Sequence, residues 1–178
     1  MSSCLFSENI DVSKYDFIYA CAQKNFGPSG ITLVIAKKEL IEKSNASLPN
    51  ILRYDAHANE ASMLNTPNTF GWYFAGKMFD WYLKMGGIKE MEAQSKMKSN
   101  VLYDLIDSSS FYHNPVDTSQ RSICNVVFTL EDPELESTFL KEASSEGLEY
   151  LKGHRTVGGM RASIYNPMKI DSVLALKE

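Results

Sequence analysis

The chain has 178 residues, of which 44% are hydrophobic and 22% are charged, an ordinary composition for a globular protein. Its formal net charge of −4 argues against a general surface for nucleic acid or for anionic membranes. Its three cysteines are scattered and form no CxxC pair, which indicates a reducing compartment and excludes a disulfide framework.

Residues 1–15 are polar, and their beginning, Met1-Ser2-Ser3-Cys4, lacks the basic and apolar regions of a secretory signal. The apolar runs that follow are too short to span a bilayer. The three histidines are too dispersed to predict a metal site. We therefore expect a cytoplasmic protein without a metal, a membrane partner or a nucleic-acid partner.

Two short apolar runs predict strands over residues 16–22 and 31–36, paired as a hairpin. Gly-Pro-Ser-Gly at 27–30 is a turn signal between them. Lys24 follows the first strand, where partial desolvation favours a neutral amine that can attack carbonyls. The alternative is an ordinary solvated lysine at the end of a strand.

A loop with a short helix near 39–43 is expected over residues 37–64. Asn65-Thr66-Pro67 then predicts a helix start, with proline at the first helical position, and the helix runs to Met85. An apolar stripe at helical spacing indicates core packing; it comprises Phe70, Phe74, Met78 and Trp81. The helix N-terminus with Thr66 suits an anion site, but Asn65 or Thr66 as a simple cap explains the pattern equally well.

A second helix is predicted over 88–107, long enough to link two lobes, with a domain boundary near residue 95. Beyond it the pattern is typical of a small α/β lobe. Its expected elements are a strand over 124–130, a helix from Asp132-Pro133 to Gly147, a short strand over 148–152, an alternating strand over 161–165 and a helix starting at 170.

Residues 153–161, Gly-His-Arg-Thr-Val-Gly-Gly-Met-Arg, concentrate cationic donors among glycines. Glycine permits a close approach of the backbone to a ligand. The two arginines offer planar forks that match carboxylate or phosphate oxygens. The segment therefore indicates a pocket for small anions, with a solvated hairpin as the alternative.

Three stretches together resemble the phosphoserine aminotransferases, pyridoxal-phosphate enzymes of serine biosynthesis. They cover nearly the whole chain in the family's order. The stretches are YACAQKNFGPSG at 19–30, NTPNTF at 65–70 and GHRTVGGMRASIYN at 153–166.

The resemblance implies an α/β fold, namely part of the large lobe of a fold-type I pyridoxal-phosphate aminotransferase (residues 1–95) plus its small C-terminal α/β lobe (96–178). It implies a homodimer with pyridoxal 5′-phosphate as cofactor. The implied reaction converts glutamate and 3-phosphohydroxypyruvate into 2-oxoglutarate and phosphoserine. A phosphorylated hydroxy-threonine of vitamin B6 synthesis is a further substrate that the resemblance suggests for a bacterial member.

Position by position, Lys24 resembles the lysine that binds the cofactor as a Schiff base and moves the proton between substrate Cα and the cofactor. Gln23 resembles a cofactor contact beside it. Asn65 and Thr66 resemble the pair that reaches the cofactor phosphate of the other subunit.

Three further residues resemble the family's substrate ligands. His154 and Arg155 correspond to ligands of the substrate phosphate. Arg161 corresponds to the arginine that binds the α-carboxylate of the amino acid.

The chain resembles only the second half of the family, and Cys21 stands where the family usually has glycine. The family's upstream half supplies an aspartate that pairs with the pyridinium nitrogen. The expected C-terminal helix also stops early. Three interpretations follow: an aminotransferase that is incomplete as this chain, a non-catalytic remnant that binds small anions or pairs with another subunit, and an enzyme completed by a separate N-terminal polypeptide.

Overall fold

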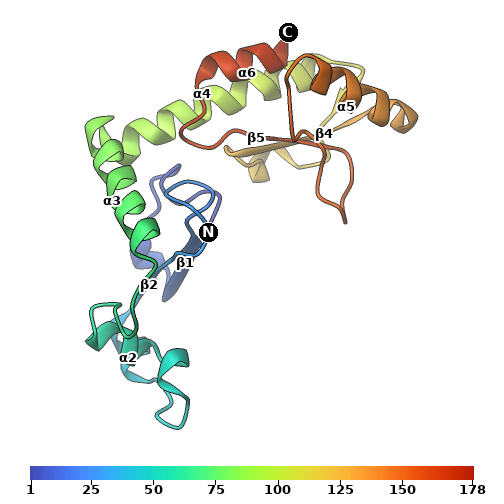
Figure 1. The fold of residues 1–178 in the computed structure, drawn as a ribbon. Coiled ribbons are helices and arrows are strands. Elements are labelled where there is room, and N and C mark those ends of the chain that lie inside the picture. The colour runs from blue at the N-terminus through green and yellow to red at the C-terminus, as the bar shows by residue number, and fades with distance from the viewer.

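The computed structural model describes residues 1–178 as two groups of elements joined by a long helix, α4 (Gly87–Ser108) (Figure 1). The first group precedes α4 in the chain. It consists of β1 (Phe17–Cys21), β2 (Thr32–Ala36), α1 (Lys38–Glu42), α2 (Tyr54–Asn59) and α3 (Thr69–Lys84). The second group consists of β3 (Tyr112–His113), β4 (Asn125–Leu130), α5 (Glu136–Ser145), β5 (Met160–Ser163) and α6 (Ile170–Lys177).

The predicted hairpin is confirmed. Strands β1 and β2 pair antiparallel, from Phe17 opposite Ala36 to Cys21 opposite Thr32. Side chains of β1 alternate between the core and solvent, as a strand with one buried face requires, with Ile18 inside and Tyr19 outside. The hairpin thus carries the loop of Lys24 at one end.

Helix α3 begins two residues later than predicted. Its N-cap is Asn68, whose side-chain oxygen accepts a hydrogen bond from the Gly71 N–H at 3.1 Å. Pro67 lies before the helix, so its predicted place at the first helical position is wrong. At the other end, Gly86 has φ +104° and lets the chain turn directly into α4.

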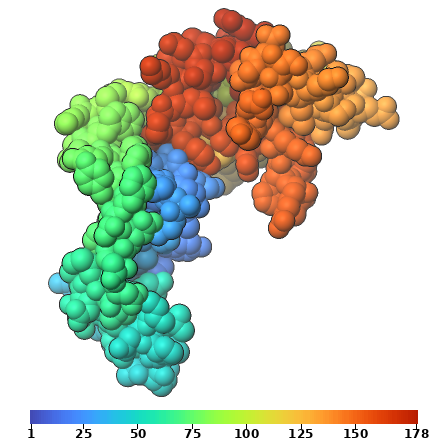
Figure 2. Space-filling model, viewed as in Figure 1, coloured from blue at the N-terminus to red at the C-terminus, as the bar shows by residue number.

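The predicted core role of the aromatic stripe on α3 is wrong for half of its members. Phe70 and Phe74 are 68% and 43% exposed, whereas Met78 and Trp81 pack against the core of the first group. Figure 2 shows α3 along an outer edge of the molecule, with the α2 region at its far end. The first group therefore leaves much aromatic surface uncovered.

The segment 37–64 contains more helix than predicted. Helix α1 matches the expected short helix, but α2 was not expected from the sequence. Helix α2 is only six residues long, too short for a clear periodic signal. It lies at the end of the molecule that is remote from the C-terminal lobe (Figure 1).

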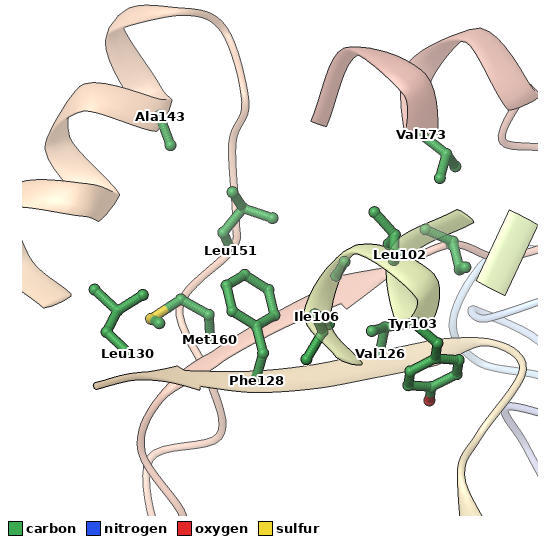
Figure 3. Packing of buried hydrophobic residues seen from close by; sticks show 12 residues of the cluster. Leu102, Tyr103, Ile106, Val126, Phe128, Leu130, Ala143, Leu151, Met160 and Val173 are labelled. Atoms are coloured by element: carbon green, nitrogen blue, oxygen red, sulfur yellow. The ribbon is translucent and has the colours of Figure 1, made fainter. Parts of the chain in front are cut away.

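The C-terminal lobe contains a three-stranded antiparallel sheet in the order β3-β4-β5. The strands bury alternate residues, because one sheet face meets the helices and the other faces away. Figure 3 shows Phe128 of β4 and Met160 of β5 in one cluster with Ile106 of α4 and Leu151. The sheet, α4, α5 and α6 thus share one apolar core.

Most of the expected elements of this lobe are confirmed. The predicted strand over 148–152 is wrong, since it forms only a single bridge between Lys152 and Met160. The two-residue β3 was not predicted, and α6 has eight residues.

The two groups have separate apolar clusters with no residue in common, one over residues 5–91 and one over residues 102–173. This separation agrees with a boundary near residue 95, which stays a prediction. None of the helices combines the length and apolar character needed to cross a bilayer.

Candidate active site

Lys24 lies in a tight turn directly after β1. The carbonyl of Ala22 accepts hydrogen bonds from the N–H groups of Phe26 and Gly27, both at 3.0 Å, and the Ala22 N–H donates to Ile31. Ala22 and Phe26 are buried, so the turn is anchored at both sides of the lysine. Gln23 and Lys24 themselves are exposed, and the partial desolvation suggested for Lys24 is absent from this chain.

Asn65 and Thr66 lie elsewhere, in a hollow of about 700 Å³ between the hairpin and the start of α3. Gly30 and residues 31–34 of the hairpin also line this hollow, but Lys24 does not. Asn68 fills the place beside Gly30, where a Cβ would lie 3.0 Å from the asparagine nitrogen. One copy of the chain therefore does not bring Asn65 and Thr66 to the lysine.

His154 and Arg155 lie in an exposed loop that projects from the C-terminal lobe (Figures 1 and 2). The loop is closed by a hydrogen bond from the Gly153 N–H to the Gly159 carbonyl at 2.8 Å. A Cβ on Gly153 would lie 2.0 Å from the Gly158 oxygen, so only glycine fits there. The His154 Nδ1 contacts the Thr156 hydroxyl at 2.8 Å, which orients the imidazole.

Arg161 lies on β5 opposite Val127 of β4. Its Nε is buried and has no hydrogen-bond partner within the protein. A buried N–H without an acceptor is costly, and an anion that supplied the acceptor would remove that cost. The orphaned Nε therefore fits a site for a carboxylate.

The strand face that carries Arg161 is polar along its length. Ser163 and Tyr165 follow at alternate positions, and both hydroxyls contact the side-chain oxygen of Asn125, at 3.1 and 3.2 Å. These bonds fix the strand next to the guanidinium. The predicted alternation over 161–165 is thus confirmed.

None of the cations proposed for the site is neutralised by the protein. Lys24, Arg155 and Arg161 take part in none of the ion pairs of the structure. Within an acidic chain, such unpaired cations favour the binding of small anions. The donor set fits an anionic cofactor and anionic substrates.

Asn25 and Asn166 had no role in the sequence interpretation, although both stand inside the motifs. They are 2% and 6% exposed, and the main-chain N–H of Asn166 donates to the Asn25 side-chain oxygen at 3.2 Å. Lys98 is also buried and bonds to the carbonyls of Tyr165 and Met168. In the sequence, Asn25 directly follows Lys24, and Asn166 stands five residues after Arg161. This proximity to candidate site residues was the signal available for the two asparagines.

The family model for class-V aminotransferases matches residues 1–176. The chain is 49% identical to a phosphoserine aminotransferase of Acinetobacter baylyi over 176 residues, which are 99% of this chain and 49% of that protein. It is also 49% identical to a phosphoserine aminotransferase of Acinetobacter baumannii over 98% of this chain and 49% of the relative. The chain thus spans about half the length of the curated relatives it matches.

Solved structures give the same result. The phosphoserine aminotransferase from Bacillus circulans subsp. alkalophilus matches with a TM-score of 0.96 and 42% identity, over 99% of this chain and 49% of that one. A pyridoxal-phosphate-bound phosphoserine aminotransferase from Trichomonas vaginalis matches with a TM-score of 0.93 and 36% identity, over 99% of this chain and 51% of that one. The expected α/β fold with a partial large lobe is confirmed.

Proposed function

The chain belongs to the class-V aminotransferase family, and from this membership we propose that it carries the second half of a phosphoserine aminotransferase. The observation that carries the proposal is the 49% identity to phosphoserine aminotransferases over 99% of the chain. This length includes Lys24, Asn65, Thr66 and Arg161. The proposed reaction transfers the amino group of glutamate to 3-phosphohydroxypyruvate and gives phosphoserine and 2-oxoglutarate.

The proposed cofactor is pyridoxal 5′-phosphate, which supplies an electron sink for the carbanion formed at the substrate Cα. Lys24 would hold the cofactor covalently, and its amine would then move the proton between the substrate Cα and the cofactor. Gln23 would contact the cofactor beside the lysine. Asn65 and Thr66 would bind the cofactor phosphate of a second subunit, which agrees with their hollow being separate from Lys24.

Substrate binding would use the unpaired cations of the C-terminal lobe. Arg161 would bind the α-carboxylate through two parallel hydrogen bonds, one of them from the buried Nε. His154 and Arg155 would bind the substrate phosphate from the projecting loop. Two anionic groups on one substrate would thus be held at separate places on the lobe, which orients the reacting carbon.

The proposed assembly is a homodimer formed through the aromatic face of α3. Large apolar side chains are exposed on this helix, and such a patch marks a protein interface. They are Phe70, Tyr73 and Phe74. A second copy is the occupant we propose, because Asn65 and Thr66 act on a partner's cofactor only if the beginning of α3 lies at the subunit boundary.

The isolated 178 residues are expected to be weakly active, since half the length of the relatives has no counterpart in them. A remnant that only binds anions or pairs with another subunit is the second candidate. The separation of Asn65 and Thr66 from Lys24 within one copy favours this second candidate for the isolated chain.

The test is covalent labelling. The chain is mixed with pyridoxal phosphate and reduced with borohydride, and the labelled peptide is located by mass spectrometry. We expect one stoichiometric adduct on Lys24. The adduct should be lost in Lys24→Ala and kept in Lys43→Ala, the control, because Lys43 is also an exposed lysine. Labels scattered over many lysines would contradict the proposed cofactor site.

A further inference from the structure

A buried polar cluster joins the lysine loop to the segment that follows β5. Its centre is the contact of Asn25 with Asn166, two residues that are 141 positions apart in the sequence. The Asn166 N–H donates to the Asn25 Oδ1, and the Asn25 Nδ2 donates to the carbonyls of Ser3 and Leu5 at 2.9 and 3.1 Å. Asn25 therefore uses its whole amide group to hold other segments.

Ser7 makes a second connection between the same two asparagines. The Asn25 Nδ2 donates to the Ser7 Oγ at 3.0 Å, and that hydroxyl donates to the Asn166 Oδ1 at 2.8 Å. Ser95 of α4 donates to the same oxygen at 3.1 Å. A buried network whose members are all satisfied is rigid and specifies one arrangement.

Lys98 fixes the far side of the cluster to α4. Its ammonium group donates to the carbonyls of Tyr165 at 2.9 Å and Met168 at 3.0 Å, and it is only 2% exposed. Lys98 takes part in none of the ion pairs of the structure. These bonds hold the turn after β5, so Asn166 cannot shift without breaking contacts to both α4 and the lysine loop.

The cluster connects the two segments that carry Lys24 and Arg161, whose relative position matters for the proposed chemistry. Lys24 directly precedes Asn25, and Arg161 stands five positions before Asn166. We propose that Asn25 and Asn166 are positioning residues that rigidly couple the lysine loop to the strand of the carboxylate-binding arginine. The role of this coupling in catalysis rests on the proposed function. The coupling between the two segments is independent of that function.

Hydrogen exchange of the full chain tests the coupling directly. Asn166→Ala is expected to speed amide exchange in residues 22–30 roughly tenfold, and Asn25→Ala to do the same in residues 160–168. Ser7→Ala removes one bridging hydroxyl and should give a smaller change of the same pattern. It replaces the asparagine variants as the test if those fail to fold. Ser99→Ala is the matched control, because this buried serine of α4 bonds only to Lys96. Changes confined to the mutated segment would overturn the coupling.

The second readout concerns the site. In the wild-type chain treated with pyridoxal phosphate but not reduced with borohydride, glutarate, a dicarboxylate, is expected to displace the pH midpoint of the adduct's absorbance. Asn166→Ala should keep the label on Lys24 but lose most of this displacement, which a merely structural residue would leave intact. An unchanged displacement would overturn the positioning role. Absence of label in the wild-type chain would overturn the proposed function and that role together, while the exchange result would still decide the coupling.

Discussion

The hydroxyl of Tyr82 donates a hydrogen bond to the main-chain carbonyl of Asn25, across 57 residues of sequence. The same hydroxyl accepts a hydrogen bond from the Asn166 Nδ2 at 3.1 Å. The ring is stacked on Phe6 at a centroid distance of 5.4 Å. One tyrosine of α3 therefore contacts the lysine loop, the N-terminal segment and the C-terminal lobe.

Removing this hydroxyl should weaken the fold. Tyr82→Phe keeps the ring packing but leaves the Asn25 carbonyl without its donor, so we expect a loss of about 1–2 kcal/mol in the free energy of unfolding at neutral pH. Urea unfolding measures it. Tyr73→Phe on the same helix is the control, because Tyr73 is 66% exposed. Equal effects of the two substitutions would contradict the importance of the buried contact.

The contact of Tyr82 with Asn25 also predicts that the free energy of unfolding depends on pH in the alkaline range. Burial raises the pKa of Tyr82 to about 12 from an ordinary value of 10.0. The folded state then holds the phenol proton more tightly than the unfolded state. The contribution of the Tyr82 hydroxyl to the stability of the folded state is therefore complete below pH 10 and is lost as the pH rises towards 12. The stability difference between the wild-type chain and Tyr82→Phe should therefore shrink over this interval, and a constant difference would contradict the assignment.

The cap of α3 gives the third prediction. Asn68→Ala removes the acceptor for the Gly71 N–H and should cost about 1 kcal/mol of stability. Thr66→Ala is the control, because Thr66 lies before the helix and makes no capping bond. Thermal unfolding of both variants decides between the two positions. A larger loss for Thr66→Ala would restore the start predicted from the sequence.

This cap shows where sequence reasoning reaches its limit. Thr66 and Asn68 both suit a cap, and Pro67 favours Thr66, so local propensity could not identify Asn68 as the cap. The hairpin and β4 were predictable because short apolar runs are typical of buried strands, and α4 was predictable because its apolar side recurs over a long segment. The exposed Phe70 was not, since a stripe that packs inside one chain and a stripe that faces a partner have the same spacing.

The residues of the candidate site, like the elements of the fold, were only partly predictable from the sequence. Lys24 and Arg161 stand in motifs that are legible in the sequence. The buried role of Asn25 and Asn166 depends on contacts between segments more than a hundred residues apart, and no local pattern encodes such a contact.

The fourth prediction concerns Arg161. Lysine offers a point charge and cannot reproduce the two parallel hydrogen bonds of a guanidinium. Arg161→Lys should therefore weaken the binding of glutarate by roughly tenfold or more. Calorimetric titration measures the affinity. Arg53→Lys is the control, since Arg53 pairs with Asp55 in the first group. Unchanged affinity in Arg161→Lys would contradict the carboxylate role.

The fifth prediction tests which end of α3 meets a second copy. Phe70 and Leu83 are both exposed, at 68% and 76%. They are 13 positions apart, which is about 20 Å along a helix. Phe70 lies at the end of α3 that carries Asn65 and Thr66, so Phe70→Glu should place a charge in the proposed interface and dissociate the dimer.

Leu83→Glu makes the same chemical change at the other end and should leave the association intact. Sedimentation velocity at several protein concentrations distinguishes the two variants. Dissociation by Leu83→Glu alone would move the interface to the α3–α4 corner. It would then separate Asn65 and Thr66 from the subunit boundary and remove the basis for their action on a partner's cofactor.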